Sequence, residues 1–200
     1  DPLLRAWSIA VAANGDVYVT DRQDRAIRRF RADGRPLERF NARGQAGGPS
    51  WLPSGVAVTA DGDVLVADAG LHAVLRYPFD GKRILAEAGG RGYGRGHLNR
   101  PLDVAGAPDG TWVVADADHF RLQRFARDGR PLAILGGLGE ALGSFFTPDG
   151  LDVAPDGTLV VGDSALRRIQ RLSAAGEPLA LLPGWGPSAF FVLADVADAG

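Results

Sequence analysis

The chain has 200 residues, of which 46% are hydrophobic and 23% charged, with no cysteine and a formal net charge of -2. This balance is typical of a folded protein and argues against a disordered chain. The lack of cysteine excludes disulfides, thiolate nucleophiles and cysteine-based zinc sites, and the near-neutral charge removes the basic excess of a general nucleic-acid-binding protein.

Four residues recur along the chain with fixed spacing. A turn glycine is followed six residues later by Asp, eight residues after that by Arg, and five after that by another Gly. The sets are Gly15, Asp21, Arg29, Gly34; Gly62, Asp68, Arg76, Gly81; Gly110, Asp116, Arg124, Gly129; and Gly157, Asp163, Arg171, Gly176. Each set starts 47 or 48 residues after the last. A constant period of this length predicts one array of repeated units, so we treat residues 1–200 as a single domain.

The first unit predicts four strands. An apolar run at residues 9–12 is joined by Asn14-Gly15 to a second run at 17–19, a third strand is expected at 26–30, and a fourth at 36–40. Asn-Gly between apolar runs indicates a hairpin, and we expect a type I′ turn with positive φ at both central residues. The unit should therefore be a small antiparallel sheet.

The later units repeat this pattern. Their second strands are almost continuously apolar, at residues 64–66, 112–114 and 159–161, which predicts sheets covered on both faces. Complete units are expected at about 7–40, 55–87, 103–135 and 150–182, and residues 190–200 look like the first strand of a further unit. Glycine-rich connections join the units, and no helical periodicity competes, so helices should be few or absent.

The segment from Gly89 to Phe125 resembles an NHL repeat, and the likeness extends over essentially the whole chain. This resemblance implies an all-β fold, a β-propeller of four-stranded antiparallel blades, usually in rings of six. We therefore expect about four complete blades that are part of a six-bladed ring, with a closed four-bladed ring as the alternative. The family pattern often places Arg five residues after the recurring Asp; here it is kept as Arg121 and Arg168 but replaced by Ala26 and Ala73.

The recurring Asp and Arg residues have two interpretations. The four Asp residues could line a polar rim that binds a ligand, or accept hydrogen bonds from backbone amides of the turn that follows each of them. The four Arg residues could form a ring that contacts an anionic partner, or pack between blades and pair locally. We favour the structural interpretation for both rows.

The three histidines lead to the hypothesis of a catalytic metal site. Blade topology places His72, His97 and His119 on one face, and three His ligands with an open position would make a catalytic zinc site. They occupy dissimilar points of the repeat, however, so we expect exposed histidines, no metal and no cofactor. We find no serine-based triad and no phosphate-binding loop.

Binding residues are expected in the first blade and in the connections. Residues 22–43 carry a local excess of arginine, and aromatic residues such as Trp51 and Tyr93 lie in the connections, where they could anchor a partner or fill gaps between blades. The predicted binding residues are Arg22, Arg25, Arg28, Trp51, Tyr93, Arg95, His97 and His119.

The sequence favours a non-enzymatic binding or scaffold propeller that contacts a protein partner within a larger assembly. A small-molecule ligand is also possible. The first alternative is a metal-dependent lyase or lactonase-like hydrolase at the channel mouth, and the second is single-stranded RNA binding. Because the first residue is Asp1 rather than Met, we expect an extracytoplasmic protein, periplasmic or secreted, or a piece of a longer chain. No apolar run reaches the roughly 18 residues of a membrane-spanning helix.

Overall fold

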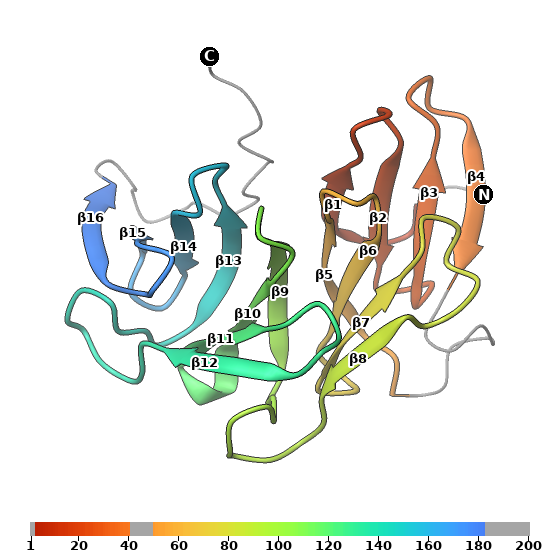
Figure 1. Cartoon of the computed structure of the whole chain (residues 1–200). Helices are drawn as coiled ribbons and strands as arrows, with labels where there is room; N and C mark the ends of the chain where they lie inside the picture. Colours follow the sequence, from red (N-terminus) through yellow and green to blue (C-terminus); the bar gives the residue numbers. More distant parts are fainter. Residues whose placement is uncertain (1–2, 41–49, 183–200) are drawn as a thin grey trace.

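The computed structural model describes residues 3–40 and 50–182, which form four four-stranded antiparallel sheets in chain order (Figure 1). Blade 1 contains β1 (Ala6–Val11), β2 (Val17–Asp21), β3 (Ala26–Phe30) and β4 (Pro36–Phe40). Blade 2 contains β5 (Pro53–Val58), β6 (Val64–Asp68), β7 (Ala73–Tyr77) and β8 (Ala86–Gly89). Blade 3 contains β9 (Pro101–Gly106), β10 (Trp112–Asp116), β11 (Arg121–Phe125) and β12 (Pro131–Leu135). Blade 4 contains β13 (Pro148–Val153), β14 (Leu159–Asp163), β15 (Arg168–Leu172) and β16 (Pro178–Leu182).

The blades stand around a common centre, with the first strand of each innermost. Strand β1 contacts β5, β5 contacts β9, and β9 contacts β13, so the inner strands form a curved row. The expected all-β, propeller-like arrangement is confirmed. Within the described residues the helical content is one 3-10 turn, η2 (Ala117–His119). The strand expected at residues 190–200 lies outside the described residues.

The hairpin turns between the first two strands of each blade differ from the predicted type. Their glycines have φ of 81° to 83°, but Asn14 and its Asp counterparts are absent from the residues with positive φ. The Gly15 amide donates to the Ala12 carbonyl, and the Ala12 amide donates to Asp16, both at 2.8 Å. This is a type I turn followed by a left-handed glycine, so the type I′ prediction was wrong. Asn14 stabilises the turn through its Oδ1, which accepts the Asp16 amide at 3.0 Å.

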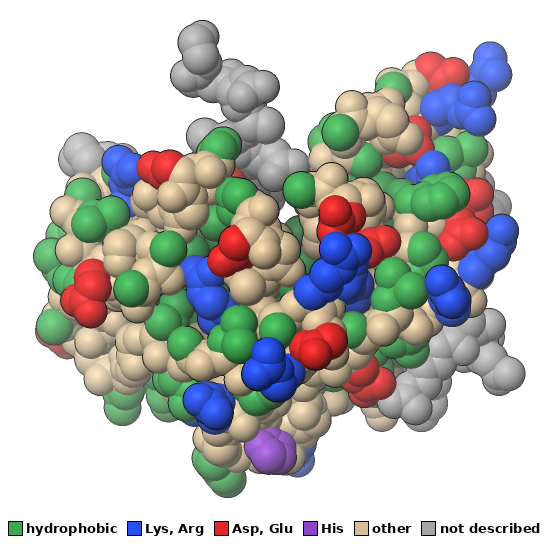
Figure 2. Space-filling view, viewed as in Figure 1, with side chains coloured by type: hydrophobic (Ala, Val, Ile, Leu, Met, Phe, Trp, Pro, Cys, Tyr) green, Lys and Arg blue, Asp and Glu red, His purple; other side chains and the backbone are tan. Residues whose placement is uncertain are grey.

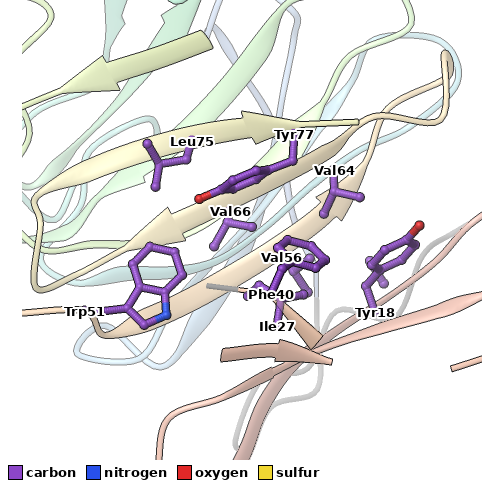
Figure 3. Packing of buried hydrophobic residues seen from close by; sticks show 10 residues of the cluster. Tyr18, Ile27, Phe40, Trp51, Val56, Val64, Val66, Leu75 and Tyr77 are labelled. Carbon is purple, nitrogen blue, oxygen red and sulfur yellow. The ribbon is translucent and has the colours of Figure 1, made fainter. Parts of the chain in front are cut away.

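Most of the hydrophobic core lies between blades rather than inside one. Tyr18, Ile27 and Phe40 of blade 1 pack against blade 2, where their neighbours include Val66 and Tyr77 (Figure 3). Two further clusters repeat this arrangement between blades 2 and 3 and between blades 3 and 4. Because each sheet buries apolar side chains on a neighbouring sheet, stability comes from stacking, as in other repeat proteins.

Candidate functional site

The inner strands line a central pocket of about 350 Å³ that is open to solvent. Its polar groups include Ser8 and Asp103, and both connect neighbouring blades: Ser8 Oγ accepts the Val56 amide at 3.2 Å, and Asp103 Oδ2 accepts the Leu151 amide at 2.9 Å. Burial raises the pKa of Asp103 to about 7, and the nearby Asp152 and Asp149 carboxylates add to this effect, while its two backbone hydrogen bonds oppose it. These contacts give the polar channel residues a structural role.

The recurring Asp residues are fully buried and organise the connections around them, as the structural interpretation predicted. Asp68, for example, accepts the amide of Leu52 at 2.8 Å from the incoming connection and the amides of Gly70 and Leu71 from the turn after β6. Burial raises the pKa of Asp68 to about 6 against the lowering effect of these hydrogen bonds. Asp21 and Asp163 make the same kind of contacts.

Two of the recurring Arg residues, Arg76 and Arg124, join neighbouring blades, whereas Arg171 is exposed. Arg76 forms an ion pair with Asp63 in its own blade and donates to the Arg127 carbonyl of blade 3 at 3.0 Å. Arg124 donates to Thr111 Oγ1 at 2.9 Å and to the Ala174 carbonyl of blade 4 at 2.8 Å. Each side chain therefore closes a contact between two sheets.

The prediction of exposed histidines is wrong for His72 and His119, which are partly buried against separate partners. His72 Nδ1 accepts the Arg100 amide at 3.0 Å, and His119 Nδ1 lies 2.9 Å from the Asp116 carboxylate. His97 is exposed in the connection between β8 and β9. Across residues 3–40 and 50–182, no group of three or more His, Cys, Asp or Glu side chains is arranged to hold a metal ion. The proposed histidine ligand set therefore gains no support from the geometry.

Two connections between blades, residues 90–100 and 137–147, are each fixed to the following blade by one Arg and one Gln side chain. Arg121 donates to the Gly94 and His97 carbonyls at 3.0 and 3.1 Å. Gln123 donates to the same His97 carbonyl at 2.6 Å and accepts the Gly96 amide at 2.9 Å. Because Gln123 is fully buried, these bonds hold residues 90–100 rigidly against blade 3.

The connection at residues 137–147 is held in the same way by blade 4. Arg168 donates to the carbonyls of Glu140, Ala141 and Ser144 at 2.6 to 2.9 Å. Gln170 donates to Ser144 and accepts the Gly143 amide at 2.8 Å. Arg121 and Arg168 keep the family pattern in only two units, and no role was predicted for them. The Gln that follows each of them by two residues was the signal that was missed.

These two fixed connections expose large side chains. We call residues 90–100 and 137–147 together the loop face. Tyr93 is 87% exposed, Leu138 62% and Leu142 46%, and Phe146 is also exposed. Arg91, Arg95 and His97 are exposed on the first of the two connections. The loop face therefore presents aromatic, aliphatic and cationic groups to solvent.

Trp51, Arg22, Arg25 and His119, which were also predicted to bind a partner, lie outside these two connections. Trp51 is 1% exposed and belongs to the core between blades 1 and 2, so it fills the gap between blades instead of serving as an anchor. Arg22 stacks on the Trp7 ring at 3.5 Å, and Arg25 occupies the turn after β2 with φ of 51°. His119 lies under Tyr93, with ring centroids 5.5 Å apart.

Several arginines of blade 1 are paired with carboxylates. Arg28 Nη2 lies 2.8 Å from Asp24, Arg39 Nη2 lies 2.6 Å from the same side chain, and Arg29 pairs with Asp16 and Glu38. In the view of Figure 2, Lys and Arg side chains are interspersed with Asp and Glu side chains rather than gathered into one large patch. This pairing weakens the case for blade 1 as an anion-binding surface.

The architecture defines a propeller-type protein built of four-stranded blades. Residues 51–77 match the NHL repeat model. This match confirms the predicted NHL repeat in blade 2, and the arrangement of the four sheets confirms the predicted propeller-like fold. Searching the curated proteins finds none that matches this chain. The described part of the chain contains no helix with the length and apolar character needed to span a bilayer.

Solved structures share the fold at low sequence identity. A catalytically inactive virginiamycin B lyase from Staphylococcus aureus, in its structure with quinupristin, is 18% identical with a TM-score of 0.68, over 87% of this chain and 54% of the lyase. Hydrazine synthase from Kuenenia stuttgartiensis is 16% identical with a TM-score of 0.68, over 90% of this chain and 49% of the synthase chain. A Bacteroides caccae protein of unknown function is 17% identical with a TM-score of 0.65, over 88% and 60% of the two chains. The chain thus spans about half the length of these proteins, and at this identity the likeness concerns the fold alone.

Proposed function

We propose that the chain is a non-enzymatic NHL-type propeller module that binds a protein partner through the loop face. The observation that carries this proposal is that Tyr93, which at 87% is the most exposed large hydrophobic side chain among the described residues, lies on a connection fixed by the buried Gln123. Tyr and Arg are enriched among the residues that dominate interface energetics. A rigid connection also loses little conformational entropy when it binds, so its exposed groups contribute more of their contact energy to affinity.

We infer that the four blades are part of a larger ring, with six as the proposed blade count. Support comes from blade 1, where Trp7, Ile9 and Val11 on β1 are 42 to 48% exposed. The residue of blade 2 at the position of Ile9 is Val56, which is 4% exposed because it packs on blade 1. An additional blade against β1 would bury the corresponding side chains of blade 1 in the same way.

Neither alternative function is favoured by a specific contact. The histidines of the metal hypothesis are bound to separate backbone and carboxylate groups. For RNA binding, the arginines that prompted the hypothesis are mostly paired with carboxylates in blade 1. Both remain predictions from the sequence.

Site-specific photo-crosslinking tests the proposed function. A photoreactive phenylalanine analogue would replace Tyr93 in one variant and Phe79 in another, and both would be produced in the native host. Phe79 is a suitable control because it is 56% exposed and lies in the turn after β7, at the end of the strands opposite to the loop face. We expect one discrete protein adduct from position 93 that is absent from position 79. Equal labelling at both positions, or no adduct at position 93, would contradict a partner on the loop face.

A further inference from the structure

The first connection of the loop face alternates cationic and aromatic side chains. Arg91, Tyr93 and Arg95 are all exposed there. Neither of these two arginines forms an ion pair with any residue that the structure describes, whereas Arg100 on the same connection pairs with Asp118 at 2.6 Å. Arg91 and Arg95 therefore keep their charge available for an anionic group of a partner.

Tyr93 is supported from below by a chain of contacts that ends in the protein interior. Its ring lies against the His119 ring, with centroids 5.5 Å apart and an interplanar angle of 46°. His119 is bound to Asp116, which is fully buried and also accepts from Arg121 at 2.9 Å. The exposed aromatic ring thus packs on one side against a His119 ring that is itself held by a buried carboxylate, and its other side is open to a partner.

The second connection of the loop face has the opposite character. Residues 137–147 contain no Lys or Arg, and their single charged residue is Glu140. Leu138, Leu142 and Phe146 are exposed there, at 62%, 46% and 36%. The two connections lead into β9 and β13 at the same end of the strands, so a ligand that extends across blade 3 meets cations and an aromatic ring on the first and apolar groups on the second.

We propose that the loop face binds an acidic protein segment that also carries large apolar side chains. The carboxylates of the segment pair with Arg91 and Arg95 on either side of Tyr93, and its apolar side chains pack on Leu138 and Leu142. This assignment rests on the proposed function and adds the chemical class of the partner. A single-stranded nucleic acid fits less well, because its phosphates require cations along the whole path and the second connection supplies none.

Fluorescence anisotropy with purified chain 1–200 tests this inference. The probes are a labelled dodecapeptide of alternating Glu and Leu, a poly-Glu dodecapeptide and an oligouridylate of similar length. We expect the Glu-Leu peptide to bind most tightly, and the double variant Arg91→Ala/Arg95→Ala to bind it about tenfold more weakly. The control Arg31→Ala/Arg83→Ala removes the same charge from exposed positions in the turns after β3 and β7, and it should bind like wild type.

Three results would overturn the inference. These are no binding of the Glu-Leu peptide, equal binding of poly-Glu, or tighter binding of the oligouridylate. Leu138→Ser tests the apolar contribution, because it should lower the affinity for the Glu-Leu peptide without changing the affinity for poly-Glu. If photo-crosslinking at position 93 captures a partner while the acidic peptides fail to bind, the proposed function stands and only the partner class is wrong.

Discussion

At the scale of single residues, the recurring polar side chains act mainly through the backbone. Asp163, for instance, accepts the amides of Phe146, Thr147 and Leu166, and so fixes an incoming connection and an outgoing turn at once. The sequence predicted this role for the Asp row, because a short carboxylate before a turn commonly binds the amides that follow it. It could not predict the bonds to the incoming connection, since these join residues 16 or 17 positions apart.

Asp103 leads to a prediction about the pH dependence of stability. Its pKa in the folded protein is about 7, above the ordinary value of 3.8, so the folded state binds a proton more readily than the unfolded state. The stabilising effect of protonation is complete below the unfolded pKa and is lost as the pH rises through 7. Between pH 5 and pH 8 the free energy of unfolding of wild type should therefore fall relative to Asp103→Asn, by on the order of 2 kcal/mol.

Urea denaturation at several pH values measures this difference. Asp156→Asn is the control, because hydrogen bonds from Thr158 hold the pKa of that exposed carboxyl below its usual value, and it stays ionised across this range. Its stability difference from wild type should be constant between pH 5 and pH 8. A constant difference for Asp103→Asn as well would show that the channel carboxylate does not titrate there.

At the scale of elements, hairpins and strands follow from local sequence, but the turn geometry and the connections do not. The alternation of apolar runs with Asn-Gly or Asp-Gly located every first hairpin, while the choice of a type I turn depends on the Asn14 side chain binding the Asp16 amide. The fixed connections depend on Gln123 and Gln170, which contact carbonyls 26 residues earlier. Such long-range partners become visible only when the blades are placed side by side.

The contacts between blades predict that Arg124→Ala and Arg171→Ala, at equivalent positions of blades 3 and 4, change the free energy of unfolding by different amounts. Arg124→Ala loses bonds to Thr111 and to the Ala174 carbonyl of blade 4, and it should lower the free energy of unfolding by about 1–2 kcal/mol. Arg171→Ala is the matched control, because this arginine occupies the same row in blade 4 but is exposed. It should change stability by less than about 0.5 kcal/mol. Equal losses for the two variants in chemical denaturation would argue against a bond between blades.

At the scale of the whole molecule, the fold is an array stabilised by face-to-face stacking. The repeat period predicted this architecture, because units of this length cannot bury their apolar faces alone. The number of blades in the ring does not follow from the period, because each stacking contact involves only two neighbouring blades. The cluster that contains Tyr18 and Tyr77, between blades 1 and 2, is one such contact.

Equivalent substitutions in blades 1 and 2 should show where stacking occurs. Val56→Ala removes a side chain that is 4% exposed between two blades, and it should cost about 2 kcal/mol. Ile9→Ala changes the equivalent residue of blade 1, which is 46% exposed, and should cost less than about 1 kcal/mol in chain 1–200. Thermal and urea unfolding of both variants give the comparison. If Ile9→Ala were the more costly of the two, another segment would have to cover β1.

Hydrogen exchange of residues 90–100 in the free chain shows whether this part of the loop face is held in place before any partner binds. The amide of Gly96 bonds to Gln123 and that of Leu98 bonds to the Gly90 carbonyl, so both should exchange far more slowly than in an unstructured peptide. Gln123→Ala should speed exchange in this segment by about tenfold, while Gln23→Ala, at an exposed position in the turn after β2, should leave it unchanged. Exchange of residues 90–100 at the unprotected rate in wild type would contradict the account.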